Sequence, residues 1–188
     1  MLLSGSGAAA SAWVQRFAGL IRPGGTVLDV ACGRSGRHLR WLAAQGFALT
    51  GIDRDPAASL DTPTGARVLI ADIEAGPWPL AGQRFDAVVV TNYLWRALWP
   101  TLRASLADEG VLICETFALG QQTVGRPSRP EFLLRPGELL QAFEGLRVVA
   151  FEDGFEPEVP RFVQRIAAVN AVAELAEPRP YGLGGTAR

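Results

Sequence analysis

The sequence predicts an α/β fold, with a single-domain, doubly wound sheet of seven strands that is mostly parallel. Short apolar runs alternate with segments of helical periodicity along most of the 188 residues. Several runs, such as Ala-Val-Val-Val at 87–90, are apolar on both faces, as are strands of a parallel sheet that helices cover on both sides. The chain is long enough for one compact core and too short for two.

The predicted elements follow one another in order. A helix at 11–21, which Ser11 can cap, ends at Pro23-Gly24-Gly25. The segment 154–160 is too short for a crossover helix, so we expect an antiparallel C-terminal strand in a Rossmann-like sheet. We expect strands at 26–31, 47–53, 67–71, 85–91, 110–115, 146–152 and 162–169, and further helices at 36–45, 56–60, 96–106 and 136–143.

The domain is expected to span 11–175, between a flexible N-terminus at 1–10 and a disordered tail at 176–188 that is rich in Pro and Gly. No basic residue precedes an apolar stretch at the N-terminus, so a secretory signal is not indicated. No apolar run is long enough to cross a bilayer. We therefore expect a cytoplasmic protein without a membrane partner.

Composition narrows the function classes. The formal net charge is −1 and all 18 basic residues are Arg. A nucleic-acid partner is therefore not expected, and lysine-based Schiff-base or phosphate-loop chemistry is excluded. Two Cys and one His at these spacings do not predict a metal site.

The most informative segment is 27–36, where an apolar strand, a glycine-containing turn and a helix start follow one another. In a doubly wound fold a nucleotide-like ligand approaches the backbone at this first turn. Gly33 and Gly36 permit a close approach because they carry no Cβ, and the backbone N–H groups of the following helix face the ligand.

Acidic residues follow the next two predicted strands. Asp53 ends the second strand, where a carboxylate accepts hydrogen bonds from two ribose hydroxyls. Asp72 ends the third strand and is placed to accept from an adenine amino group, while Ile73 packs on the ring. Together these positions predict a nucleoside site.

A dinucleotide-binding dehydrogenase is the first alternative. The pattern Ala31-x-Gly33-x-x-Gly36 is one Gly short of the NAD fingerprint. Against this interpretation, Asp29 lies inside the motif, where dinucleotide proteins continue apolar. An acid also ends the third strand, and one domain uses the whole chain.

Four segments together resemble the successive cofactor motifs of class I methyltransferases, which use S-adenosylmethionine (SAM). The resemblance covers about 13–169. The stretch 91–96 and parts of 113–139 are similar to the bacterial branch that includes tellurite-resistance methyltransferases, which act on small molecules. The four segments are Asp29-Val-Ala-Cys-Gly33, Gly51-Ile-Asp53, Ala71-Asp72-Ile73-Glu74 and Phe85-Asp-Ala-Val-Val-Val-Thr91-Asn92.

The resemblance implies transfer of a methyl group from SAM to a small-molecule acceptor by in-line displacement. It implies that Asp29 orients the turn and reaches the SAM amino group through water, and that Thr91 and Asn92 line the methionine and methyl-donor region. The turn from Gly33 to Gly36 is one residue longer than the family pattern. The expected cofactor-binding residues are Asp29, Ala31, Gly33, Gly36, Asp53, Asp72, Ile73, Thr91 and Asn92.

Catalytic and acceptor-binding candidates are fewer. His38 is a candidate catalytic base. It is equally well interpreted as a structural residue, because the positive end of its helix disfavours its charged form. Tyr93 lies just past a strand end, in the expected ligand crevice. The long Gly/Pro/Arg-rich segment 117–135 is expected to form a movable cover over the acceptor. Its Arg126 and Arg129 either bind an anionic acceptor or are solvated loop residues.

Two alternatives to a methyltransferase stay open at this point. One is a SAM-binding sensor or accessory protein without transfer activity. The other is the NAD-dependent oxidoreductase considered above. Equilibrium binding of SAM and NAD, followed by a transfer assay, separates these classes.

Overall fold

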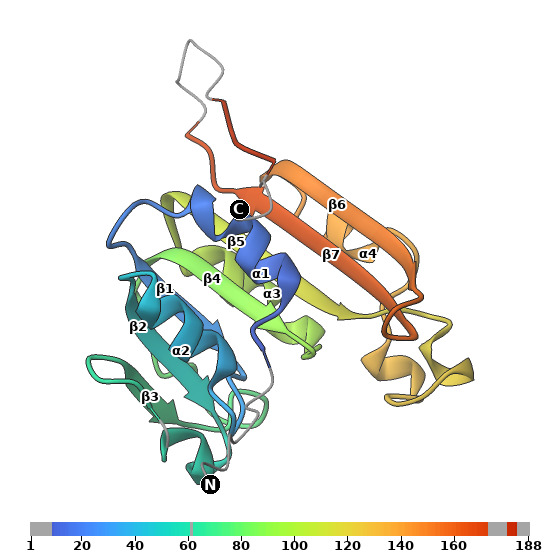
Figure 1. Ribbon diagram of the computed structural model, residues 1–188, viewed down its shortest axis with the longest axis horizontal. Coiled ribbons are helices and arrows are strands. Elements are labelled where there is room, and N and C mark those ends of the chain that lie inside the picture. Colours follow the sequence, from blue (N-terminus) through green and yellow to red (C-terminus); the bar gives the residue numbers. More distant parts are fainter. Residues whose placement is uncertain (1–8, 61, 173–179, 184–188) are drawn as a thin grey trace, which may run out of the picture.

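The computed structural model describes residues 9–60, 62–172 and 180–183. These residues form one sheet of seven strands in the order β3-β2-β1-β4-β5-β7-β6 (Figure 1). The strands are β1 (Thr26–Val30), β2 (Ala48–Asp53), β3 (Arg67–Ile70), β4 (Phe85–Thr91), β5 (Leu106–Phe117), β6 (Arg147–Glu156) and β7 (Arg161–Val169).

Pairing follows the predicted topology. β1 to β5 pair in parallel, whereas β7 is antiparallel to both of its neighbours, β5 and β6. The prediction of a mostly parallel, doubly wound sheet with an antiparallel C-terminal strand is therefore confirmed. Because β1 to β5 run the same way, their carboxyl ends meet at one edge of the sheet.

Helices cover both faces of the sheet. In Figure 1, α1 (Ala12–Phe17) and α2 (Arg37–Ala44) lie in front of the sheet, and α3 (Trp99–Ala104) and α4 (Glu138–Ala142) lie behind it. Side chains of α1 and α2 share one apolar cluster, and those of α3 and α4 share the other. The central strands alternate between these clusters: Val27 packs on the first, Leu28 and Val30 on the second.

Several elements differ from their predicted bounds, most of all in the stretch from 96 to 117. The helix expected at 96–106 is a 3-10 turn, η3 (Arg96–Leu98), followed by the six-residue α3, with Pro100 in its first turn. Leu106 already begins β5, which has twelve residues. The reason is tertiary: Leu106 pairs with Phe85 of β4 through a register shift, and this pairing overrides local helical periodicity.

The chain ends are partly described. Ala10 is buried, and the Ser11 hydroxyl accepts a hydrogen bond from Trp13 N–H and so caps α1 as predicted. Most of the expected flexible start 1–10 lies outside the described residues, as do 176–179 and 184–188 of the expected disordered tail. Within 180–183, the Tyr181 hydroxyl donates to the Glu109 carboxylate at 2.9 Å, and disorder of the tail stays a prediction. No helix among the described residues is long and apolar enough to span a membrane.

Close packing under the first turn generates a stability prediction. A Cβ on Gly51, in β2, would lie 2.9 Å from Cys32 Sγ and 3.0 Å from Leu39 Cδ1. Gly51→Ala should therefore destabilise the fold by about 1–3 kcal/mol through overpacking. Gly19→Ala is the control, since nothing lies within 4 Å of a Cβ there. Equal unfolding midpoints for the two variants in urea would contradict this packing.

Candidate cofactor-binding site

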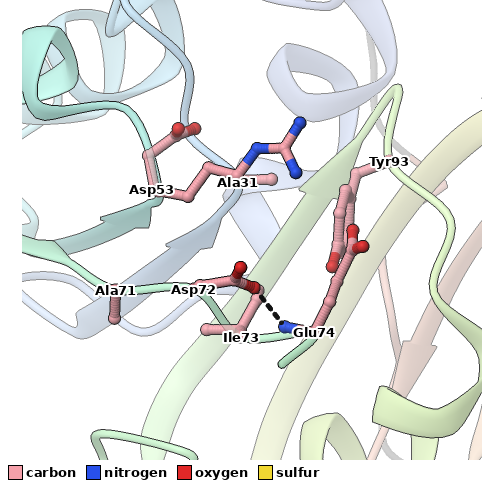
Figure 2. A pocket seen from close by; sticks show the side chains of 8 residues that line it. Ala31, Asp53, Ala71, Asp72, Ile73, Glu74 and Tyr93 are labelled. Carbon is pink, nitrogen blue, oxygen red and sulfur yellow. Dashed lines mark hydrogen bonds between the residues drawn. The ribbon is translucent and has the colours of Figure 1, made fainter. Parts of the chain in front are cut away.

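A cavity of about 240 Å³ opens at the edge where the parallel strands end (Figure 2). Its walls come from the segments that follow β1, β2, β3 and β4. In an open α/β sheet, ligands bind beyond the carboxyl ends of the strands, near the point where strand order reverses. Here that point lies between β1 and β4. The lining residues are Ala31, Asp53, Arg54, Ala71, Asp72, Ile73, Glu74 and Tyr93.

Five of the predicted site residues line this cavity: Ala31, Asp53, Asp72, Ile73 and Tyr93. The other expected cofactor residues lie in the adjoining turns and strand ends without lining it. They are Asp29, Gly33, Gly36, Thr91 and Asn92.

Sequence reasoning assigned no role to Arg54 and Glu74, which also line the cavity. Each directly follows a residue that the sequence placed in the site. The strand-end positions were therefore a sufficient signal for both, because a cavity at a strand end is lined by consecutive residues of the turn.

The turns at the ends of β1 and β4 have unusual backbone conformations. Ala31 has φ 53° and Asn92 has φ 54°, both in the left-handed region, where a non-glycine residue costs roughly 1–2 kcal/mol. Gly33 and Gly36 also have positive φ. Strain of this kind concentrates at functional sites. It marks the adjacent ends of β1 and β4 as a candidate binding position.

Asp53 is held by the turn above it. Its carboxylate accepts from Gly33 N–H at 2.8 Å and from Asp55 N–H at 2.9 Å, one bond to each oxygen. The longer turn from Gly33 to Gly36 is thus tied to the end of β2. Each carboxylate oxygen has a second lone pair, so Asp53 still has acceptor capacity for ligand hydroxyls.

Asp72 is fixed in a similar way by its own turn. Its Oδ1 accepts from the backbone N–H groups of Glu74 and Ala75 at 2.9 and 3.1 Å. These bonds, from Ala75 and then Glu74, lower the pKa of Asp72 below its usual value. Asp72 therefore presents a charged acceptor, with Oδ2 unused by this turn.

Tyr93 forms the opposite wall. Figure 2 shows its side chain beside that of Glu74, with Asp53 across the cavity. Burial, followed by the Glu74 charge, raises the pKa of Tyr93 above its usual range. Its hydroxyl is buried and makes no hydrogen bond of ordinary geometry within the described residues. Tyr93 is therefore suited to donating a hydrogen bond and unsuited to acting as a base.

His38 lies behind the cavity wall, not in it. Its Nε2 accepts from Ser11 N–H at 3.2 Å, and burial lowers its pKa to about 4. The proton of the neutral ring therefore sits on Nδ1, 3.5 Å from Thr91 Oγ1 and 3.8 Å from Asp29 Oδ2. This geometry favours the structural interpretation of His38 over the role of a catalytic base.

The arginines of the loop after β5 do not reach the cavity. Arg126 and Arg129 are both exposed, and Arg129 lies 3.9 Å from Glu131. Neither lines the cavity. The structure thus places both candidates in solvent and brings no predicted acceptor-binding residue except Tyr93 to the site.

The loop itself is more ordered than the sequence predicts. Phe117 is the last residue of β5. Two backbone hydrogen bonds join the ends of the loop: Leu134 N–H donates to the Phe117 carbonyl, and Leu119 N–H donates to the Leu134 carbonyl, both at 2.9 Å. Gln121 is buried, and its side-chain oxygen accepts from Phe162 N–H. The base of the loop is therefore closed, and only its tip projects.

Arg96 fastens this loop to the segment that follows β4. Its guanidinium makes a bidentate pair with Glu138 at 2.7 and 2.9 Å. It also donates to the carbonyls of Glu131 and Leu133 at 2.7 and 2.9 Å. Because Tyr93 lies three positions before Arg96 in the chain, this clamp connects the loop to the wall of the cavity.

Known proteins are similar to this chain in sequence family and in fold. The sequence model of a methyltransferase-domain family matches residues 6–148. No curated protein sequence matches the chain significantly. Among solved structures, TehB from Haemophilus influenzae has a TM-score of 0.65 at 16% identity. The alignment covers 81% of this chain but only 59% of TehB.

Two further structures have the same fold over most of their length. A TehB-like SAM-dependent methyltransferase from Corynebacterium glutamicum has a TM-score of 0.59 at 20% identity, with 83% of this chain and 85% of that chain covered. A protein solved in work on thioacetal formation during echinomycin biosynthesis has a TM-score of 0.64 at 22% identity, with 87% and 82% covered.

The fold is that of a class I methyltransferase. The chain belongs to the methyltransferase-domain family, whose model matches most of its length. Membership of this family and fold implies SAM as the cofactor.

The Arg96 clamp generates a prediction about the loop. Arg96→Gln should speed cleavage of the tip by chymotrypsin after Phe132, or by a Glu-specific protease after Glu131, by about tenfold. Loss of charge-assisted bonds worth about 1.5 kcal/mol makes local opening that much more frequent. Trypsin is uninformative, because each arginine of the tip precedes a proline.

Arg129→Gln is the matched control for this experiment, since Arg129 is exposed and makes only a long pair with Glu131. It should be cleaved at the parent's rate. If a folded Arg96→Gln protein were also cleaved at that rate, Arg96 would not be what closes the loop.

Proposed function

We propose that the cavity binds SAM and that the protein transfers its methyl group to a small-molecule acceptor. The observation that carries the proposal is the convergence of Asp53, Asp72 and Ile73 on one cavity beside the first glycine turn. A nucleoside needs hydroxyl acceptors, an amino-group acceptor and an apolar wall for its ring. These three residues supply them.

In this proposal the adenosine part of the cofactor lies over the ends of β2 and β3. Asp53 accepts from the ribose hydroxyls, and Asp72 Oδ2 accepts from the adenine amino group while Ile73 contacts the ring. The methionine part then lies at the adjacent ends of β1 and β4, near Asp29, the turn Gly33–Gly36 and the pair Thr91–Asn92.

When bound, the cofactor supplies a methyl group activated by a sulfonium. The chain's own residues bind and orient the reactants for in-line attack and keep water away from the reacting atoms. Tyr93 lines the cavity, and its hydroxyl is proposed to donate a hydrogen bond to an oxygen of the methyl-accepting substrate. A nucleophilic anion needs no general base, which agrees with the placement of His38 behind the wall.

Three observations support a small-molecule acceptor. The formal net charge is −1, which does not favour nucleic acid. The loop after β5 is closed at its base, and Arg96 ties it to the segment that carries Tyr93. One structure of the same fold comes from echinomycin biosynthesis. The tip of the loop, which carries Arg126 and Arg129, is proposed to contact the acceptor.

The test is equilibrium binding of SAM, S-adenosylhomocysteine (SAH) and NAD, followed by transfer of labelled methyl to a panel of small acceptors. Micromolar binding of SAM and SAH with no comparable binding of NAD is expected. NAD binding without SAM binding would favour the oxidoreductase. SAM binding with no transfer to any acceptor would favour a sensor or accessory protein.

Asp53→Asn provides the residue-level prediction. Charge-assisted hydrogen bonds are worth about 1.5–3 kcal/mol, so SAH affinity should fall roughly ten- to a hundredfold. The near-isosteric amide keeps an acceptor for the turn. Asp108→Asn, at an exposed acid outside the cavity, should bind like the parent. An unchanged dissociation constant in folded Asp53→Asn would remove Asp53 from the site.

A further inference from the structure

Asp29 is a buried acid in β1. Only 1% of the residue is exposed, and neither carboxyl oxygen has a hydrogen-bond partner within the described residues. A charged carboxylate in such a place is costly unless it is paired. Burial accordingly raises the pKa of Asp29 to about 8. In the free protein at neutral pH, Asp29 is therefore mostly a neutral acid.

The groups around Asp29 do not neutralise a carboxylate. On α2, the charge of Arg37 favours the charged form of Asp29, but burial outweighs it, and on β2 the charge of Asp53 opposes the charged form. His38 is held neutral by burial, and Ser11 N–H occupies its Nε2. On β4, Thr91 offers only a hydroxyl, 3.5 Å from His38 Nδ1.

The position of Asp29 suggests what completes it. It lies two residues before Ala31, which lines the cavity, and β1 pairs with β4 beside it. Under the proposed function, on which this inference rests, the amino-acid part of the cofactor lies at these two strand ends. That part carries an ammonium group, whereas no cationic side chain among the described residues donates a hydrogen bond to Asp29.

We propose that Asp29 exchanges its proton for the cofactor's ammonium, so that cofactor binding releases one proton. The Asp29 O–H bond breaks, the proton leaves to the buffer, and the ammonium keeps its own protons. His38 is a positioning residue for this step. Its Nδ1–H, fixed by the Ser11 bond and 3.8 Å from Asp29 Oδ2, stabilises the carboxylate once it forms.

The coupling makes cofactor affinity depend on pH. Below the pKa of free Asp29, each pH unit should lower the SAH dissociation constant by about tenfold, because one proton leaves for each ligand bound. Above that pKa, near 8, the affinity should level off.

The experiment is titration calorimetry of SAH at pH 6.5 in two buffers with different ionisation enthalpies. The parent should release about one proton per SAH bound. Asp29→Asn, nearly isosteric, should release none and lose the pH dependence. Release below about 0.3 protons by the parent, or equal release by Asp29→Asn, would overturn the proposal.

A second readout does not need the variant to bind. Infrared difference spectra of the parent should lose a buried carboxylic-acid band when SAH is added, and free Asp29→Asn should lack that band. A band that persists in the SAH complex would overturn the proposal. If SAH does not bind the parent at all, the proposed function fails, and the band of the free protein still reports the protonation of Asp29.

Variants of His38 test the positioning role. Asn can place its side-chain N–H near the position of Nδ1, whereas Leu offers no donor. His38→Asn should keep the parent's pH profile for SAH binding. His38→Leu should move the midpoint of this pH profile to higher pH, because the Asp29 carboxylate loses the Nδ1–H donor of His38. Identical midpoints for both variants would show that His38 only fills space.

Discussion

The parallel run of β1 to β5 is the constraint on which the rest of the structure depends. Helices cover both faces of these strands, so β1 and β4 can carry polar groups only at their ends or where something pairs them. All five carboxyl ends lie at one edge, and the turns beyond them meet there. Residues far apart in the sequence, from Ala31 to Tyr93, line one cavity for this reason. Asp29 is an acidic side chain buried within β1, so it needs either a proton or a cationic partner.

Much of this arrangement could be predicted from the sequence, because it depends on local patterns. Apolar runs located the strands, and the end of each run located Asp53 and Asp72. The rest depends on contacts between distant residues. The early start of β5 comes from pairing of Leu106 with Phe85. Likewise, the bonds that Arg96 makes to Leu133 and Glu138 leave no periodic trace in the sequence, so the closure of the loop at its base was not predicted.

The two sides of the site differ in how they are held. Backbone N–H groups donate hydrogen bonds to the carboxylates of Asp53 and Asp72 and so fix their positions. The adenosine side of the proposed site is therefore preorganised. Beyond Tyr93, side-chain bonds of Arg96 and Gln121 fix the base of the loop and leave its tip projecting.

A crystal structure of the full chain with SAH would test whether the strand-end cavity is the cofactor site. We expect the ribose hydroxyls within hydrogen-bond distance of Asp53 and the adenine ring against Ile73, with its amino group at Asp72. The amino-acid part should lie at the ends of β1 and β4. SAH bound elsewhere, with this cavity unoccupied, would contradict it.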